Sequence, residues 1–211
     1  MDMLITNSIL EKADSYGVAF SSAGKSVKNF GNASVLRTRS RQESDARRGR
    51  IGELMFGEYL KPKEIYLIFD EEIRQGSNVG DGGRDIVATV KNGKTSSVPL
   101  KVDIKSTSKY GGWILVETHR FTADAYVLMQ VSEDQATYRG YAFREDFFDS
   151  DGAPYFEYFS GDNLRKCYDT DEFLEVTLDA PHQYGLPIPK LRKDGVESLL
   201  GYKKTEQLQL W

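Results

Sequence analysis

The chain has 211 residues, of which 39% are hydrophobic and 12% aromatic, so it can bury a core of its own, and one globular domain is expected. No apolar run approaches the roughly 20 residues that a membrane-spanning helix needs, and a single cysteine, Cys167, excludes an internal disulfide. The first residues lack the basic stretch and small-residue cleavage site of a signal peptide, so we expect a cytoplasmic protein with no membrane partner.

The net charge of −4 is distributed unevenly along the chain. Residues 25–50 contain eight basic and two acidic side chains, whereas residues 133–179 contain thirteen acidic and four basic ones. We interpret residues 1–39 as a basic N-terminal arm and helix that follows the phosphates of DNA, and a solvated charged face is the alternative. The side chains predicted to bind DNA are Arg37, Arg39, Arg41, Arg47, Arg48 and Arg50.

Residues 40–60 are predicted to form a helix that is capped by Ser40 or Ser44 and ends before Pro62. Glycines lower helix propensity by about 1 kcal/mol each, so the three glycines of this segment indicate close packing against a sheet. Apolar side chains recur near the helical spacing at Ile51, Leu54, Met55, Phe56 and Tyr59.

Glu53 lies at the edge of this apolar stripe, on the side of the helix that also carries Gly49, Arg50 and Gly57. We predict that Glu53 reaches a catalytic site on the sheet as an additional carboxylate. The alternative is that Glu53 is a surface residue, in the same way as Glu58.

Residues 85–107 follow a Gly-rich loop and are interpreted as a β-hairpin. Its first arm begins with residues 85–90, and the Asn-Gly pair at positions 92 and 93 is typical of a tight turn. The returning arm is expected to end with residues 100–107.

Asp103 and Lys105 are two residues apart on the returning arm, so they point to the same face, beside Asp85 of the first arm. Two converging carboxylates can hold Mg²⁺, which usually binds through one or two carboxylates and the phosphate of its substrate. Lys105 is then expected to orient an attacking water or to hold a phosphate oxygen. The combination predicts metal-assisted hydrolysis of a phosphodiester, and the alternative is the solvated face of an ordinary hairpin.

Further strands are predicted in the second half of the chain. Residues 113–117 have the pattern of a short strand, and the apolar run at 125–131 indicates a strand that is buried on both faces. Residues 136–143 are expected to pair with that strand, and short helical and extended pieces should follow Asp162. The apolar residues expected to dock on the body at the end of the chain are Leu208, Leu210 and Trp211.

Glu53 on a helix, Asp85 after a Gly-rich turn and Asp103-x-Lys105 on the second arm resemble the PD-(D/E)xK nuclease superfamily. This superfamily includes type II restriction enzymes, Holliday-junction resolvases and repair nucleases. The chain departs from the family pattern at Arg84, where proline commonly precedes the first acid, and at Asp103, where glutamate is commoner.

The resemblance covers residues 40–131 and implies an α/β fold with an αβββαβ core. The strand of Asp103 and Lys105 is then central in a mixed sheet that is flanked by helices. One nuclease domain is expected over residues 1–211, with residues 132–211 forming C-terminal strands and a docking tail.

The resemblance also implies that Glu53, Asp85, Asp103 and Lys105 are catalytic. The predicted metal ligands are the three carboxylates of this group and the backbone carbonyl of Ile104. Mg²⁺ is the expected cofactor, and Mn²⁺ should replace it because both accept oxygen ligands in octahedral geometry.

We therefore expect a metal-dependent endonuclease of restriction or defence type, acting on DNA as a homodimer because two strands need two active sites. A repair or recombination nuclease is the alternative with the same chemistry, and a catalytically inactive DNA-binding module is the alternative of another class. No nucleotide cofactor is expected, because the Ala23–Ser26 stretch resembles the end of a P-loop but position 19 is Ala19 where the motif needs glycine.

Overall fold

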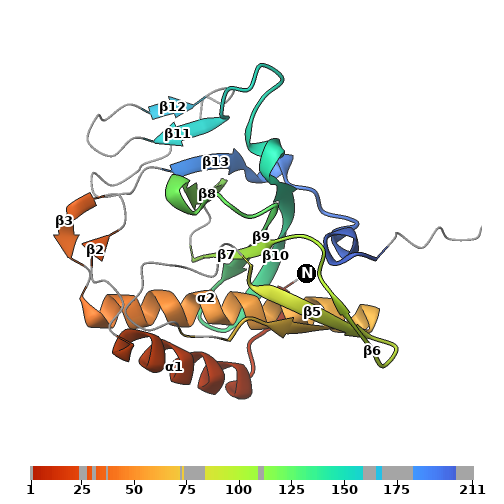
Figure 1. Ribbon diagram of the computed structural model, residues 1–211. Helices are drawn as coiled ribbons and strands as arrows, with labels where there is room; N and C mark the ends of the chain where they lie inside the picture. The colour runs from red at the N-terminus through yellow and green to blue at the C-terminus, as the bar shows by residue number, and fades with distance from the viewer. Residues whose placement is uncertain are drawn as a thin grey trace, which may run out of the picture.

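The computed structural model describes residues 2–23, 28–29, 32–36, 38–71, 73, 84–108, 112–158, 165–167 and 183–202. Its centre is a mixed sheet with helix α2 on one face and a second, antiparallel sheet on the other (Figure 1). The predicted α/β class with a mixed sheet is thus confirmed. The prediction that helices flank the sheet holds for one face, because strands cover the other.

The main sheet contains one parallel pair of strands, β7 and β9, and its other pairs are antiparallel. Its order is β1 (Asp2–Leu4), β10 (Gln135–Phe143), β9 (Ala125–Val131) and β7 (Val102–Thr107). The second sheet has the order β12 (Arg165–Cys167), β11 (Phe156–Tyr158), β13 (Gln183–Pro187) and β8 (Trp113–Glu117). A third sheet consists of β4 (Ile65–Phe69), β5 (Ile86–Lys91) and β6 (Lys94–Ser97), and β2 (Lys28–Asn29) pairs with β3 (Asn32–Leu36).

Strand β9 is buried along its whole length, as its continuous apolar sequence predicts. Successive side chains point to opposite faces of the sheet, so Val127 and Met129 enter the core beneath α2, whereas Tyr126 and Leu128 enter the core beneath the second sheet. The predicted pairing of residues 136–143 with this strand is also confirmed, through β10. The described residues therefore form two apolar cores, and β9 contributes side chains to both of them.

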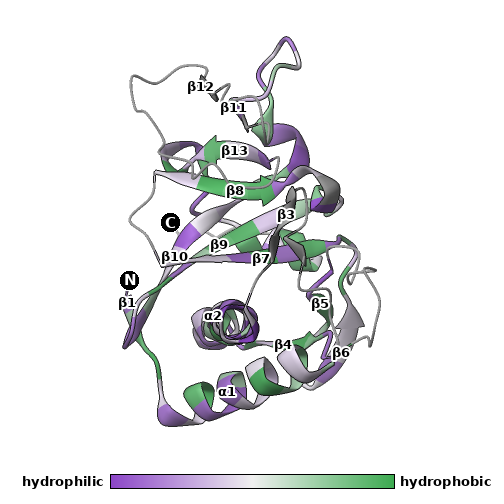
Figure 2. Cartoon of the chain, turned by 90° about the vertical axis from the view of Figure 1, so that its left-hand side faces the viewer, coloured by the Kyte–Doolittle hydropathy of each residue, from purple (hydrophilic) through white to green (hydrophobic). Residues whose placement is uncertain are grey.

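Helix α2 (Arg39–Leu60) confirms the predicted helix, and α1 (Asn7–Ser22) packs along it. Viewed along α2, the main sheet lies on one side of the helix, α1 on the opposite side, and β4 with β5 beside it (Figure 2). The predicted cap at Ser40 or Ser44 is wrong: Thr38 caps the helix, and its side chain accepts a hydrogen bond from the Arg41 N–H at 3.2 Å.

Close packing of α2 on the sheet occurs at Gly52, where a Cβ atom would lie 1.9 Å from the Ser106 Oγ of β7. Gly49 has no atom within 4 Å of the corresponding position, and Gly57 has only ordinary contacts with Phe69 at 3.7 Å. The expectation of close approach is therefore correct for one of the three glycines.

The predicted hairpin of residues 85–107 is wrong in its second arm. Strand β5 turns at Asn92 and Gly93, both with positive φ, and returns at once as β6. Val102–Thr107 instead forms β7, which ends the four-stranded sheet and is not central in it. The physical reason is the two-residue turn, which pairs Lys91 directly with Lys94 and leaves the later residues for another sheet.

The expected second helix of the αβββαβ order is also replaced. Between β7 and β9, the described residues form β8 and the 3₁₀ turn Thr118–Arg120. Further 3₁₀ turns span Lys61–Lys63, Arg144–Phe147, Ile188–Lys190 and Val196–Leu200. Arg37, the Gly-rich loop before Arg84 and the apolar residues at 208–211 lie outside the described residues, as does most of the tail from 162 to 182.

Candidate catalytic site

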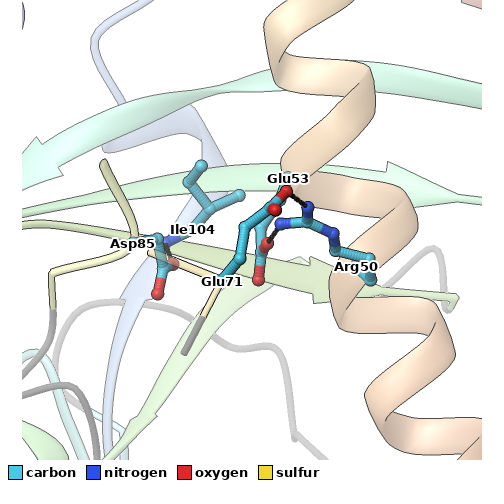
Figure 3. Close-up of polar contacts among 5 residues, drawn as sticks. All are labelled: Arg50, Glu53, Glu71, Asp85 and Ile104. Atoms are coloured by element: carbon cyan, nitrogen blue, oxygen red, sulfur yellow. Dashed lines mark hydrogen bonds and ion pairs between the residues drawn. The ribbon is translucent and has the colours of Figure 1, made fainter. Parts of the chain in front are cut away.

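Asp85 lies where β5 begins and joins that strand to the edge of β7. Its N–H donates to the Val102 carbonyl at 2.9 Å, and its Oδ2 accepts the Ile104 N–H at 2.6 Å (Figure 3). On its other side, the Asp85 carbonyl accepts the Asp70 N–H at 2.9 Å. Because β7 ends its sheet, the aspartate provides an acceptor that a neighbouring strand would otherwise supply.

Asp103 and Lys105 lie on the face of β7 that points away from α2, as the alternation predicts. Val102 and Ile104 enter the core beneath α2, whereas Asp103 is opposite Tyr126 of β9, whose ring belongs to the other core. The Lys105 Nζ lies 2.6 Å from the Asp103 Oδ2, and Asp103 is only 7% exposed. Asp103 and Lys105, which were predicted to share a face of the strand, therefore form an ion pair that is largely buried.

Lys105 is charged at neutral pH. Burial works to lower the pKa of this lysine, but the charges of Asp103 and Asp85 outweigh burial, so the pKa is raised above its ordinary value. Arg120 opposes them and lowers the same pKa. Asp103 thus forms an ion pair with this ammonium group, and the charge of Asp85 acts on it as well.

The two aspartates are the candidate ligands for a hard cation that needs few protein ligands. Carboxylate oxygens are the ligands that Mg²⁺ takes, and one or two of them are enough when substrate phosphate supplies more. Among the residues that the structure describes, no three acids, histidines or cysteines are grouped as a metal cage. Glu53 is therefore not brought to Asp85 and Asp103 as a third ligand.

Glu53 belongs instead to an ion-pair cluster that approaches from the α2 side, around Arg50 (Figure 3). The Arg50 Nη1 lies 2.7 Å from the Glu53 Oε2, and its Nη2 pairs with Glu71. The guanidinium also lies 5.4 Å from the ring centres of Tyr16 and Phe69. Burial works to lower the Arg50 pKa, but the two glutamates outweigh it and raise the pKa.

Arg50 was predicted to bind DNA, and here it is buried with only 6% of its surface exposed. Its ion pair holds one oxygen of the Glu53 carboxylate. The side chain of Glu53 is 17% exposed, which argues against the alternative that it is a surface residue. Glu58, by contrast, is 38% exposed and pairs with Lys61 on the outside of the helix.

Glu71 joins the ion-pair cluster from the end of β4, and sequence reasoning missed it. It directly follows Asp70, whose N–H donates to the Asp85 carbonyl, so the end of β4 lies next to the start of β5. A sequence signal was present, because acidic residues follow directly on the apolar run at 65–69. The direction of the Glu71 side chain could not be inferred from the sequence, because it depends on how β4 packs beside α2.

Besides Arg50, four of the arginines predicted to bind DNA are described, and they lie along α2. Arg39 and Arg41 are exposed, and the Arg39 Nη2 donates to the Ser22 Oγ at 2.9 Å. Arg47 pairs with Asp14 of α1, and Arg48 is half-buried. The structure therefore places four arginines, in addition to the buried Arg50, on the helix that also carries Glu53.

A scan against protein-family models finds no match, and searches of curated proteins and of solved structures find none either. None of the helices in the described parts of the chain combines the length and the apolar character that crossing a membrane requires.

Proposed function

We propose that the protein is a Mg²⁺-dependent DNA endonuclease that hydrolyses phosphodiester bonds. The observation that carries the proposal is the grouping of Asp85, Asp103 and Lys105 at the open edge of β7. Two carboxylates and a lysine that stays charged at neutral pH suit an anionic substrate whose hydrolysis builds up further negative charge.

Asp85 and Asp103 would hold Mg²⁺, and the backbone carbonyl of Ile104 would be an additional ligand. When bound, the cation neutralises the phosphate and lowers the pKa of a coordinated water. Lys105 holds a phosphate oxygen or orients the attacking water as a cation, because its raised pKa makes it a poor proton acceptor at neutral pH. Arg50 keeps the Glu53 carboxylate oriented beside this edge.

The order of elements supports the same proposal. Helix α2 is followed by β4, β5 and β7, and β9 then lies parallel to β7. This order is similar to the helix and four strands of an αβββαβ core. It departs from that core in the added strand β6, in the replacement of the second helix, and in the separate sheet that β4 and β5 form. Within this class we favour a homodimeric endonuclease of restriction or defence type.

The test is incubation of plasmid, linear, single-stranded and branched DNA with the protein, with and without Mg²⁺. Lys105→Ala should lower the cleavage rate about 10² to 10³-fold while duplex binding is retained, because one positioned electrostatic group is removed. Asp103→Asn should be at least as severe, and Mn²⁺ should replace Mg²⁺.

The matched control is Lys101→Ala, which removes an exposed lysine just before β7 and should leave cleavage unchanged. Cleavage that persists in EDTA would refute the metal-dependent mechanism. A fully active Lys105→Ala protein would refute the role of this lysine. Junction-specific cutting would favour a recombination nuclease, and binding without cutting would favour an inactive module.

A further inference from the structure

An open hollow of about 370 Å³ lies between the N-terminal half of α2 and the ends of β7 and β9. This volume is within the range of about 300–1,000 Å³ that small-molecule sites occupy. Its lining residues are Ser44, Arg47, Arg48, Ile51, Ser108, Val131, Ser132 and Glu133.

The position of the hollow is one that α/β proteins use for ligands. β7 and β9 are parallel neighbours, and Ser108 and Ser132 are the first residues after their carboxyl ends. Ligands in α/β sheets bind outside the carboxyl ends of such strands. Ser132 is already engaged, since its hydroxyl donates to the Gln135 carbonyl at 3.0 Å, so Ser44 and Ser108 are the neutral donors for a ligand.

The charge of the lining favours an anion. Arg47 is held by Asp14 of α1. Arg48 is less engaged, because the Asp45 Oδ1 lies 3.9 Å from its Nη1, beyond hydrogen-bond distance. The acid of the lining, Glu133, is exposed at the rim. Arg48 is therefore the cation best placed to take a ligand.

We infer that this hollow binds a backbone phosphate of the DNA strand, at a position away from the bond that is cleaved. The inference rests on the proposed nuclease function and specifies a further substrate contact. The hollow lies beside α2, whereas Asp103 and Lys105 lie on the face of β7 that points away from α2, so the phosphate that it holds is a different one from the phosphate that is cleaved.

The first experiment measures the affinity of a fluorescent 24-base-pair duplex in EDTA as a function of salt. Arg48→Ala should reduce the log–log salt slope by about 0.9, as expected for the loss of one phosphate contact, and Arg48→Lys should restore it. Arg144→Ala removes an exposed arginine outside the hollow and serves as the matched control, with an unchanged slope.

The second experiment places one neutral methylphosphonate at each position around the cut that Mg²⁺ produces. In the wild-type protein, one substitution away from the cleaved bond should weaken binding, and Arg48→Ala should remove that sensitivity. An unchanged salt slope, or an affinity that no single methylphosphonate changes, would overturn the inference while cleavage persists. A protein that does not cleave, but loses slope with Arg48, would refute the proposed function and leave a phosphate-binding hollow.

Discussion

Arg50 is a buried charged residue that pairs with two carboxylates and lies against two aromatic rings. Arg50→Ala should lower the free energy of unfolding by about 3 kcal/mol, since the mostly buried Glu53 loses its ion pair with Arg50. It should also lower cleavage more than DNA binding, because the carboxylate beside the site loses its orientation. Urea denaturation and steady-state kinetics measure the two effects.

The control for this prediction is the double variant Arg50→Met/Glu53→Met. The double variant removes the buried Glu53 charge together with Arg50, and the Glu71 carboxylate that also loses Arg50 is 71% exposed. The double variant should therefore be more stable than Arg50→Ala. Equal stability of the two variants would mean that Arg50 stabilises the fold through its ring contacts and not through the ion pair.

At the scale of single residues, the sequence predicted which face of the strand each side chain occupies, because side chains alternate along a strand. Asp103 and Lys105 share a face and are paired, and Ile104 enters the core on the opposite face. The sequence predicted that Asp85 lies beside the strand of Asp103, and Asp85 accepts a hydrogen bond from the Ile104 N–H of that strand. The hairpin that was assumed to bring them together was wrong. Glu71 was missed, because its contact with Arg50 depends on the packing of two elements.

At the scale of the elements, the close approach of α2 to β7 can be tested directly by mutation. Gly52→Ala should destabilise the protein by about 1–3 kcal/mol, because its Cβ would overlap the Ser106 Oγ and lie 3.1 Å from the Ser106 Cβ. The same change should reduce activity, since a shift of α2 moves Glu53. Chemical denaturation and cleavage assays measure both.

Gly49→Ala is the matched control on the same helix. No atom lies within 4 Å of the added methyl group, so the higher helix propensity of alanine should stabilise the protein by up to about 1 kcal/mol. Equal effects of the two substitutions would contradict the close approach at Gly52.

The 3₁₀ turn Val196–Leu200 is tied to the turn after α2 by an ion pair between Glu197 and Lys63. Burial works to raise the pKa of Glu197, but Lys63 outweighs it, so the pKa is lowered. A lowered folded-state pKa contributes stability above the unfolded pKa, and this contribution is lost as the pH falls through the folded value.

Glu197→Gln should therefore cost about 0.5 kcal/mol at pH 7, a small value because both side chains are partly exposed. The difference from wild type should shrink below a pH of about 4. Denaturation at pH 7, 5 and 3 measures the trend, and a difference that is constant down to pH 3 would contradict it.

The helix at 39–60 and the strand at 125–131 could be predicted because each has a strong local pattern, a helical apolar stripe in one and a continuous apolar run in the other. The hairpin failed because two local signals conflicted. The tight turn at Asn92 and Gly93 makes the chain return at once as β6. The chemistry of Asp103 and Lys105 instead favoured a later segment as the second arm of the hairpin. Parallel pairing of β7 with β9 has no local signature, because it joins segments about twenty residues apart.

At the scale of the whole molecule, the uneven charge predicts salt-dependent DNA binding despite the net charge of −4. Arg39 and Arg41 are exposed at the start of α2, and replacing both by alanine should reduce the log–log salt slope by about 1.8 on duplex DNA. The set of cut sites should not change, because phosphate contacts carry no sequence information. Fluorescence anisotropy at several salt concentrations measures the slope.

Lys12→Ala is the control for this prediction, since Lys12 is an exposed lysine of α1 outside the basic segment. If the Arg39/Arg41 double variant keeps the wild-type slope, the basic start of α2 is a solvated face. The phosphate contacts would then come from other parts of the surface.

The layered architecture as a whole was not predictable from local patterns. The second sheet pairs β8 at residues 113–117 with β13 at residues 183–187, and the other strands of that sheet are three residues long. Short strands carry a weak periodic signal, and pairing across some seventy residues carries none. The expected helices on both faces were consequently wrong for the face that this sheet covers.

Strand β9 contributes alternate side chains to the core beneath α2 and to the core beneath the second sheet. Neither core can open without withdrawing side chains from a strand that the other core also holds. The two halves should therefore unfold together, as one cooperative unit, although they are built on different layers. Amide protons of β9 should accordingly exchange with solvent at the rate of global unfolding, and those of the exposed strand β6 should exchange much earlier through local opening.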